Sequence, residues 1–547
     1  MPDSYSRQQL PENNVMTVTV RSDSQVLQLS LDADISLRKA LDTTELRVRA
    51  ACGGMGTCGA CLIQIIGGSF NPPTPAEYQK IHPEELANGM RLACQLRACS
   101  DGELYLQYPA PHSEWKSLDA FELYQATGNA AVTCHVYGVA VDLGTTHIRL
   151  SLWNRQSGRR IGSRYSINPQ VACGADVLTR LDADRLSDSD SQVLTQLARK
   201  AIIEGIRDIL SRDVGEVSPM LAEIGKILIV GNTAMLTLIC ASRDDSLYQP
   251  ENWQLPIACQ PIDVDAWRGT WRTPHAEIGI VQPLAGFIGS DLLADLVATA
   301  ITEQPQPALL ADFGTNTEIA LWDGQVLRVT SVPGGPAFEG VGMRNGLSAE
   351  TGAVCKVSRH DGQWRLQTLG DAPARGYCGS GFIDAIALLL EEKLLKPSGR
   401  FAEPQPTGGY LLDAANFRTA ICSADVDIFQ RAKASTAAAM AQLLVYAGLQ
   451  ADDLQTLWIC GSFGRHLDLN SAMRVGLLPT IDHRRVKLLA NAGLRGCEQL
   501  LLEPDAQDLL DTIAGRVRVV NLGGVFDYEE RFIDNLRLQP VPITECG

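Results

Sequence analysis

The chain has 547 residues, of which 45% are hydrophobic, and a formal net charge of −16 at pH 7. This length allows three or four domains with a large buried core. The acidic balance argues against nucleic acid or an anionic membrane as the main partner.

The N-terminal stretch 1–14 is polar and has no basic segment followed by an apolar core, so we expect no secretory signal. The longest apolar runs, such as Ile386 to Leu390, are too short to cross a bilayer. The 15 cysteines are mostly scattered singly, as buried thiols in a reducing compartment are. We therefore expect a cytoplasmic protein without a membrane-spanning segment.

Two short segments after this tail predict a β-hairpin, because Thr17 to Val20 and Val26 to Leu31 alternate apolar and polar residues around a polar turn. Ser36 then predicts the start of a helix. Leu104 to Tyr108 predicts a closing strand. Together these elements predict a small β-grasp, ferredoxin-like domain over 15–109.

Within this domain, four cysteines surround a glycine-rich loop: Cys52, Cys58, Cys61 and Cys94. Glycines let the backbone wrap closely and point N–H groups at sulfides, so the pattern predicts an iron–sulfur cluster and electron transfer. The loop between the first two cysteines is longer than in plant-type ferredoxins and resembles that of adrenodoxin-like ferredoxins. A four-cysteine zinc site, with Cys99 joining Cys94 as a second pair, and four buried thiols are the alternatives.

One sequence unit then occurs twice. Val139 to Trp153 contains Asp-Leu-Gly-Thr-Thr, and Leu309 to Trp322 contains Asp-Phe-Gly-Thr-Asn. Each copy predicts a strand that ends in Asp, a tight Gly-Thr turn and a second strand. A single copy is equally compatible with an ordinary hairpin turn. The pair predicts two hairpins that grip a nucleoside triphosphate from both sides.

The residues of this predicted clamp have three roles. Asp142 and Asp312 flank a hydrated magnesium ion. Asp312 also orients the attacking water, with Glu318 as the second choice. Backbone N–H groups and hydroxyls of the two turns hold phosphate, and these residues are Gly144, Thr145, Thr146, Gly314, Thr315 and Asn316.

Two more glycine-rich turns suit the nucleoside end of ATP. Gly461, Ser462 and Gly464 follow a buried-type strand, and Gly379 and Ser380 open a helical run. A plain turn or helix start is the alternative for each. The chain has neither a P-loop nor a dinucleotide-binding fingerprint. The order of these turns resembles the actin, heat-shock ATPase and sugar kinase superfamily, which implies an ATPase core with two ribonuclease H-like halves.

A ferredoxin loop followed by such a core resembles the reductive activators of corrinoid proteins. The stretches that carry this resemblance are Asn168 to Gln170, Gly174 to Val177, Val230 to Met235, Phe287 to Asp291, Pro333 to Gly340, Cys378 to Gly381 and Gly476 to Pro479. The sequence departs from the family pattern at Ser462, where a second glycine is expected, and at Asn521 to Gly524.

The resemblance implies a multidomain α+β and α/β protein. It implies ATP-dependent transfer of one electron from a 2Fe-2S cluster to the cobalt(II) of a corrinoid protein, with ATP and Mg as further cofactors. It also implies an upstream electron donor and suggests a homodimer. The predicted organisation is a polar tail (1–14), the ferredoxin-like domain (15–109), a linker (110–135), a middle domain with the first phosphate turn (136–303), a C-terminal ATPase domain (304–537) and a tail (538–547).

Other functions are compatible with the same residues. One is an ATP-gated, ferredoxin-type electron carrier for another low-potential enzyme. Another is a phosphotransferase with a redox-sensing domain, which would need a pocket for a small acceptor. Formation of cobalt(I) distinguishes the activator from both alternatives.

Overall fold

The structure is a computed structural model. It describes residues 15–23, 25–41, 44, 46, 48, 56, 61–81, 83–107, 115–119, 123–126, 134–174, 176–210, 217–243, 245–340, 342–404, 409–461, 463 and 465–541.

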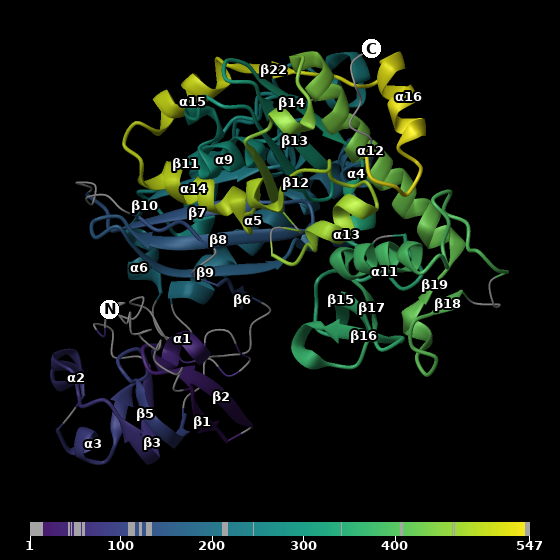
Figure 1. Ribbon diagram of the computed structural model, residues 1–547. Coiled ribbons are helices and arrows are strands. Elements are labelled where there is room, and N and C mark those ends of the chain that lie inside the picture. The colour runs from purple at the N-terminus through teal and green to yellow at the C-terminus, as the bar shows by residue number, and fades with distance from the viewer. Residues whose placement is uncertain are drawn as a thin grey trace, which may run out of the picture.

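The N-terminal module, drawn in purple and dark blue in Figure 1, is a five-stranded sheet in the order β2-β1-β5-β3-β4. The predicted hairpin is confirmed as β1 and β2, and β1 also pairs in parallel with β5, as in a β-grasp fold. The elements of the module are β1 (Val15–Arg21), β2 (Val26–Asp32), α1 (Leu37–Leu41), β3 (Leu62–Phe70), α2 (Pro75–Lys80), α3 (Pro83–Ala87), β4 (Met90–Leu92) and β5 (Ala98–Tyr105).

The closing strand differs from the prediction, because β5 begins at Ala98 and ends at Tyr105. Residues 98–103 are small or polar and include Gly102, so they lack the alternation that marks a half-buried strand. β5 nevertheless lies between β1 and β3, and backbone pairing on both sides defines it as a strand.

The rest of the chain forms a larger part, the body, which contains two six-stranded sheets. The first sheet has the order β11-β10-β7-β8-β9-β6. Helices α5 and α7 bury one of its faces in a shared apolar core. The elements of this half are β6 (Lys116–Ser117), β7 (Tyr137–Leu143), β8 (His147–Asn154), β9 (Arg159–Ile167), α4 (Val177–Leu186), α5 (Asp188–Leu210), α6 (Ser218–Ala222), β10 (Ile224–Gly231), α7 (Thr233–Cys240), α8 (Val264–Trp271), β11 (Glu277–Ile280) and α9 (Ser290–Thr299).

The second half repeats this arrangement in the order β21-β20-β12-β13-β14-β22. A small three-stranded sheet, β15 to β17, extends from it, and α11 packs on this sheet. The elements are β12 (Ala308–Phe313), β13 (Thr317–Trp322), β14 (Leu327–Val332), α10 (Gly335–Phe338), β15 (Ala353–His360), β16 (Gln363–Thr368), β17 (Gly376–Tyr377), α11 (Gly379–Glu391), β18 (Tyr410–Leu411), β19 (Ala420–Ile421), α12 (Ser423–Ala447), β20 (Thr456–Gly461), α13 (Leu469–Arg474), β21 (Val486–Leu488), α14 (Ala492–Leu502), α15 (Ala506–Ala514), β22 (Val517–Val519) and α16 (Phe526–Asp534).

The two sheets have the same pairing pattern: an antiparallel three-strand meander whose first strand pairs in parallel with a later strand. The sequence repeat therefore corresponds to a repeated fold, as predicted. Helices α9 and α14 pack against each other and share one buried cluster with strands of both sheets. They approach closely at Gly496, where a Cβ atom would collide with the Ala294 carbonyl.

Part of the predicted linker belongs structurally to the body. Trp115 is buried in the core of the first half, and β6 pairs with β9. Leu123 is buried beside α14, and the backbone N–H of Tyr124 donates to Glu498 at 3.0 Å. Arg160 donates to the same carboxylate and to the Tyr124 carbonyl. These contacts fasten residues 115–126, where described, to the body.

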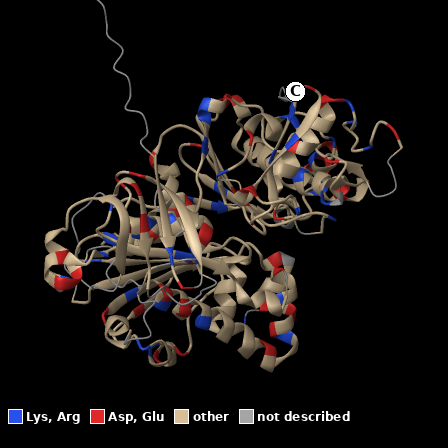
Figure 2. Ribbon diagram, turned by 90° about the horizontal axis from the view of Figure 1, so that it is seen from below, with Lys and Arg blue, Asp and Glu red and all other residues tan. Residues whose placement is uncertain are grey.

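Acidic and basic residues are distributed over helices and loops of the molecule seen from below (Figure 2). Across the described residues, no helix combines the length and the apolar character needed to span a bilayer.

Candidate nucleotide site and cluster site

The two Gly-Thr turns of the repeated unit lie against each other. We call Gly144–Thr146 the first turn and Gly314–Asn316 the second turn. The hydroxyl oxygens of Thr146 and Thr315 are 3.0 Å apart, although they belong to different halves of the body. Each turn is closed by its glycine N–H, which donates at 3.0 Å to the carbonyl of His147 or Asn316. The predicted pair of facing turns is therefore present.

Different contacts support the two turns. Asn168 donates to the carbonyls of Gly144 and Thr146, both at 2.9 Å, and Arg180 donates to the Thr145 carbonyl at 2.8 Å. These polar contacts hold the first turn and leave the Thr145 side chain buried. Behind the second turn, Phe313 packs on Phe338 and Phe463, with ring centroids 5.6 and 5.0 Å apart.

The two predicted catalytic aspartates lie near the ends of equivalent strands, β7 and β12. Asp142 pairs across the hairpin with Arg149, whose guanidinium lies 3.4 Å from its carboxylate. Asp312 pairs across its hairpin with Glu318. Burial raises the pKa of Asp142 to about 6, although the Arg149 charge opposes this shift. Burial also raises the pKa of Asp312.

Two further carboxylates from α9, which the sequence analysis did not assign, join this cluster. Asp291 and Asp295 are four residues apart and so lie on one face of the helix. Burial, followed by the charges of Asp142 and Asp312, raises the pKa of Asp291 to about 7. Burial and the neighbouring Asp312 also raise the pKa of Asp295 well above its usual range. Their i, i+4 spacing within an otherwise apolar helix was the available signal.

A close approach of backbone to each aspartate completes this geometry. Gly461 ends β20 with φ +70°, and a Cβ there would collide with the Asp312 carboxylate. Gly493, in the first turn of α14, faces Asp142, and a Cβ there would lie 3.4 Å from that carboxylate. Gly461 was predicted as part of the nucleoside turn. Its positive φ and its contact with Asp312 explain why this position is a glycine. Ser462 and Gly464 lie outside the described residues.

A cavity of about 2400 Å³ opens beside the turns and between the two parts of the molecule. Predicted nucleotide residues line it: Thr146, Thr315, Asn316, Gly379, Ser380 and Gly461. The Ser380 hydroxyl is already bonded to the Cys355 carbonyl at 3.0 Å.

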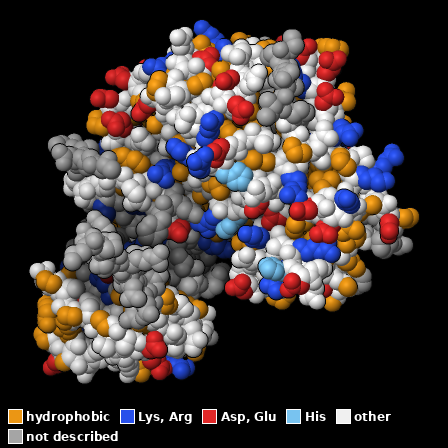
Figure 3. All heavy atoms as spheres, in the orientation of Figure 1, with side chains coloured by type: hydrophobic (Ala, Val, Ile, Leu, Met, Phe, Trp, Pro, Cys, Tyr) orange, Lys and Arg blue, Asp and Glu red, His pale blue; other side chains and the backbone are white. Residues whose placement is uncertain are grey.

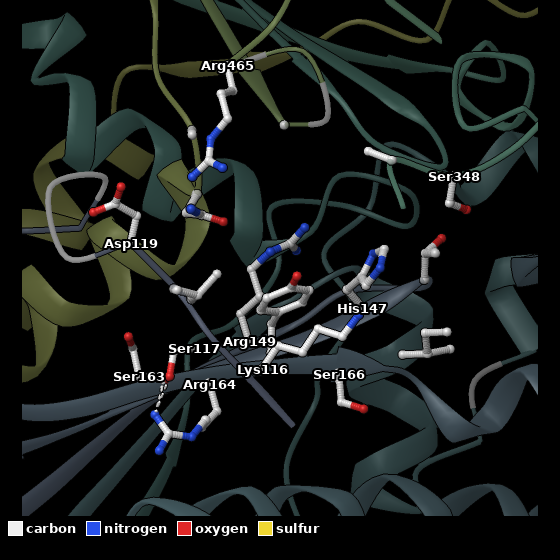
Figure 4. Close-up of a pocket in the computed structure, with 18 of the residues that line it drawn as sticks. Lys116, Ser117, Asp119, His147, Arg149, Ser163, Arg164, Ser166, Ser348 and Arg465 are labelled. Carbon is white, nitrogen blue, oxygen red and sulfur yellow. Dashed lines mark hydrogen bonds between the residues drawn. The ribbon is translucent and has the colours of Figure 1, made fainter. Parts of the chain in front are cut away.

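The cavity wall is rich in basic residues. Lys116 and Arg149 lie together with the imidazole of His147 in Figure 4, and Arg465 reaches in from the C-terminal half. Burial and the Arg149 charge lower the pKa of His147 to about 3. Lys, Arg and His side chains also gather on the body where it faces the N-terminal module (Figure 3).

Two of the four predicted cluster cysteines are described and lie at the ends of two paired strands, β3 and β4. Cys61 directly precedes β3 and Cys94 follows β4, and the Ala93 N–H donates to the Cys61 carbonyl at 2.8 Å. Both side chains are buried, and the Gln95 amide donates to the Cys94 sulfur at 3.5 Å. Cys94 and Gln95 also line the cavity. Cys52 and Cys58 lie outside the described residues.

The chain matches three family models: a 2Fe-2S iron-sulfur cluster binding domain over residues 19–99, the RACo middle region over 137–304, and the C-terminal domain of RACo, the ASKHA domain, over 306–545. The first match supports a 2Fe-2S cluster over the zinc alternative, and the ASKHA match implies nucleotide binding.

The chain is 27% identical over 406 residues to the corrinoid activation enzyme RamQ of Eubacterium limosum, covering 69% of this chain and 66% of RamQ. It is 27% identical over 418 residues to the Co(II) methylated amine-specific corrinoid protein reductase of Methanosarcina barkeri, covering 71% and 74%. A solved reductive activator for corrinoid, iron-sulfur protein has the same fold, with a TM-score of 0.63 and 22% identity over 96% of this chain and 98% of that chain. The chain therefore belongs to the RACo family, with a 2Fe-2S domain, a RACo middle region and a C-terminal ASKHA domain in that order.

Proposed function

We propose that this protein is an ATP-dependent reductive activator, which transfers one electron from its 2Fe-2S cluster to the inactive cobalt(II) of a corrinoid protein and so restores cobalt(I). An upstream electron donor reduces the cluster for the next transfer. The names of the two curated relatives support a corrinoid protein as the partner.

One observation carries the proposal: the cavity that is lined by Cys94 is also lined by Thr146 and Thr315. A cluster ligand and the hydroxyls of both phosphate turns thus share one space. A shared cavity gives the nucleotide state a route to influence the environment of the electron donor.

The body supplies the nucleotide site. Gly144, Thr145, Gly314 and Asn316 shape the two turns around the phosphates in our proposal, and the Thr146 and Thr315 hydroxyls bind phosphate. In our proposal the nucleoside lies against Gly379, Ser380 and Gly461, and Ser462 and Gly464, outside the described residues, stay predicted contacts. In our proposal Asp312 orients the attacking water.

The carboxylate cluster fits a divalent cation. Within the described part of the chain, the Asp312 Oδ1 atom and both Asp295 oxygens are buried without a hydrogen-bond partner. Clustered buried carboxylates repel one another unless a cation or protons neutralise them. No three His, Cys, Asp or Glu side chains among the described residues are arranged to ligate one metal ion directly. Asp142 and Asp312 would therefore hold Mg²⁺ through its water shell, as Mg²⁺ prefers.

The cluster site fits thiolate ligation as far as the structure describes it. Cys61 and Cys94 are adjacent and buried, and the Gln95 amide donates to sulfur, a contact that tunes iron–sulfur potentials. Cys52 and Cys58 would complete the four ligands. The cluster supplies one-electron redox chemistry.

ATP contributes through the geometry of the body. A nucleotide between the two turns contacts both halves, so it stabilises the arrangement that binds it better. It shifts the equilibrium only by its differential affinity for the two arrangements, and hydrolysis then resets the cycle.

The test is a spectroscopic assay with anaerobically prepared full-length protein, a chemical reductant and a corrinoid protein in the cobalt(II) state. We expect cobalt(I) absorbance to appear with Mg-ATP and to be much weaker without it. Cys94→Ala should remove this activity and much of the visible cluster absorbance, yet retain nucleotide binding.

Three results would contradict the proposal. Absence of cobalt(I) with a reduced cluster would favour the ATP-gated carrier. A phosphorylated small molecule would favour the phosphotransferase. Protein that binds no adenine nucleotide would exclude an ATP-dependent role.

A further inference from the structure

Glu339 makes a contact that the proposed nucleotide site does not use. Its Oε2 atom accepts hydrogen bonds from Thr146 Oγ1 at 3.0 Å and from Thr315 Oγ1 at 3.2 Å. Each hydroxyl has one proton, so two hydroxyls that donate to this oxygen have none left for another acceptor. One carboxylate oxygen therefore occupies the donors of both turns.

The contact joins the two halves of the body. Glu339 directly follows α10, and the preceding Phe338 packs on Phe313 and Phe463 of the C-terminal half. Thr146 belongs to the other half. The Thr146–Glu339 bond is thus a link across the cleft between halves.

The backbone is constrained on both sides of Glu339, by the packing of Phe338 before it and by close backbone contacts of Gly340 after it. Gly340 has φ +80°, and a Cβ on Gly346 would collide with the Gly340 carbonyl. The side chain therefore projects from a constrained loop.

A phosphate group and this carboxylate compete for the same place. Both are anions that accept from the Thr146 and Thr315 hydroxyls. Two such anions at contact distance repel each other strongly where solvent is partly excluded. Burial raises the pKa of Glu339, and the hydrogen bonds from Thr146 and Thr315, followed by the Arg149 charge, oppose this shift.

We propose that Glu339 is an internal anion that takes the place of phosphate at the two turns, and that the bound nucleotide displaces it. The inference rests on the proposed role of the turns in phosphate binding. When phosphate accepts from the two hydroxyls, the Thr146–Glu339 hydrogen bond is broken. The conformation of residues 333–340 then depends on whether a nucleotide is bound. Phe338 then carries the change to the aromatic cluster beside Asp312.

The test compares Glu339→Gln with Glu350→Gln as the matched control. Glu350 lines the same cavity but is 44% exposed, pairs with Arg375 at 3.3 Å, and has no bond to either turn. Affinity for Mg-ADP and for a slowly hydrolysed ATP analogue is measured by titration calorimetry. We expect Glu339→Gln to bind roughly tenfold more tightly than the unchanged protein, because the competing charge is gone. Glu350→Gln should be unchanged.

Hydrogen exchange gives a second readout that needs no catalytic activity. In the unchanged protein, saturating nucleotide should increase amide exchange of residues 333–340. In Glu339→Ala, which has no side-chain acceptor, this exchange should already be raised without nucleotide. Glu339→Gln keeps an acceptor oxygen, so it should show a smaller rise.

Unchanged or weaker nucleotide affinity in both Glu339 variants overturns the inference. Normal affinity with lost hydrolysis also overturns it, because Glu339 would then act in the hydrolytic step. If the unchanged protein binds no adenine nucleotide, the proposed function fails. If the unchanged protein binds nucleotide and the variants do not bind it more tightly, only the displacement by phosphate fails.

Discussion

The first and second turns come from one repeated unit, yet their surroundings differ in chemistry. The first turn is held by amide and guanidinium donors, and its aspartate faces Arg149. The second turn is backed by aromatic rings, and its aspartate faces Glu318. A duplicated fold has therefore become one turn whose aspartate pairs with a cation and one whose aspartate faces a second carboxyl group, where a bound cation or protons reduce the repulsion.

The largest expected effect comes from replacing the two aspartates. Asp312→Ala should reduce ATP hydrolysis by about a thousandfold, because in our proposal Asp312 orients the attacking water. Asp142→Ala should reduce ATP hydrolysis by only about tenfold to a hundredfold, because Arg149 already neutralises part of the Asp142 charge. Phosphate release measures both rates, and the visible cluster spectrum should stay unchanged. Equal losses would mean that the two turns contribute alike.

Replacing the two glycines beside the aspartates should lower the stability of the protein by different amounts. Gly461→Ala should lower the free energy of unfolding by about 2 kcal/mol or more, because it adds a Cβ at φ +70° that collides with Asp312. Gly493→Ala lies in a helix with ordinary contact distances, so it should change stability by less than about 1 kcal/mol. Urea denaturation followed by far-UV circular dichroism compares the two. A larger loss of stability in Gly493→Ala than in Gly461→Ala would show that Gly493 is the position with less room for a side chain.

The residues opposite the aspartates should affect nucleotide affinity unequally. Arg149→Met should weaken binding of a fluorescent ATP analogue by about tenfold, because it removes a cation from the wall of the phosphate site. Glu318→Gln should change affinity by less than about threefold, because burial and neighbouring acids raise the pKa of Glu318 well above its usual range. Arg159→Met, at another cavity arginine, serves as the control for Arg149. A stronger effect at Glu318 would contradict the proposed division of charge.

The smallest difference between the two turns is expected when the Thr146 and Thr315 hydroxyls are replaced and nucleotide affinity is measured. Thr146→Ser and Thr315→Ser both keep the donor, so each should alter nucleotide affinity by less than about threefold. Thr146→Val and Thr315→Val remove it and should weaken binding by similar amounts, roughly fivefold. The same titration detects these changes. A large asymmetry between the valine variants would show that phosphate contacts one turn only.

The sequence predicted these turns well because each depends on local order: a strand, an aspartate and a Gly-Thr turn. It also predicted the repeated fold, since both copies were recognisable. Asp291, Asp295 and Glu339 were not assigned roles, because their neighbours in space come from distant parts of the chain. No local pattern reveals that a carboxylate after Phe338 reaches the hydroxyl of Thr146.

The burial of residues in the predicted linker was also not apparent from the sequence. Prolines and mixed polarity predicted a connector over 110–135, whereas Trp115 and Leu123 are buried. A lone tryptophan or leucine in such a stretch has no periodicity that would indicate burial. Its partners, on α5 and α14, become apparent only in the folded protein.

The packing of residues 115–126 determines where a different electron donor can be grafted onto this molecule. Trp115 fills part of the body's core, and removing a buried tryptophan costs about 3–5 kcal/mol. A chimera that joins after Tyr124 would discard this side chain and the bond to Glu498. A junction upstream of Trp115 keeps both, so the body retains its own attachment point for interchangeable redox modules.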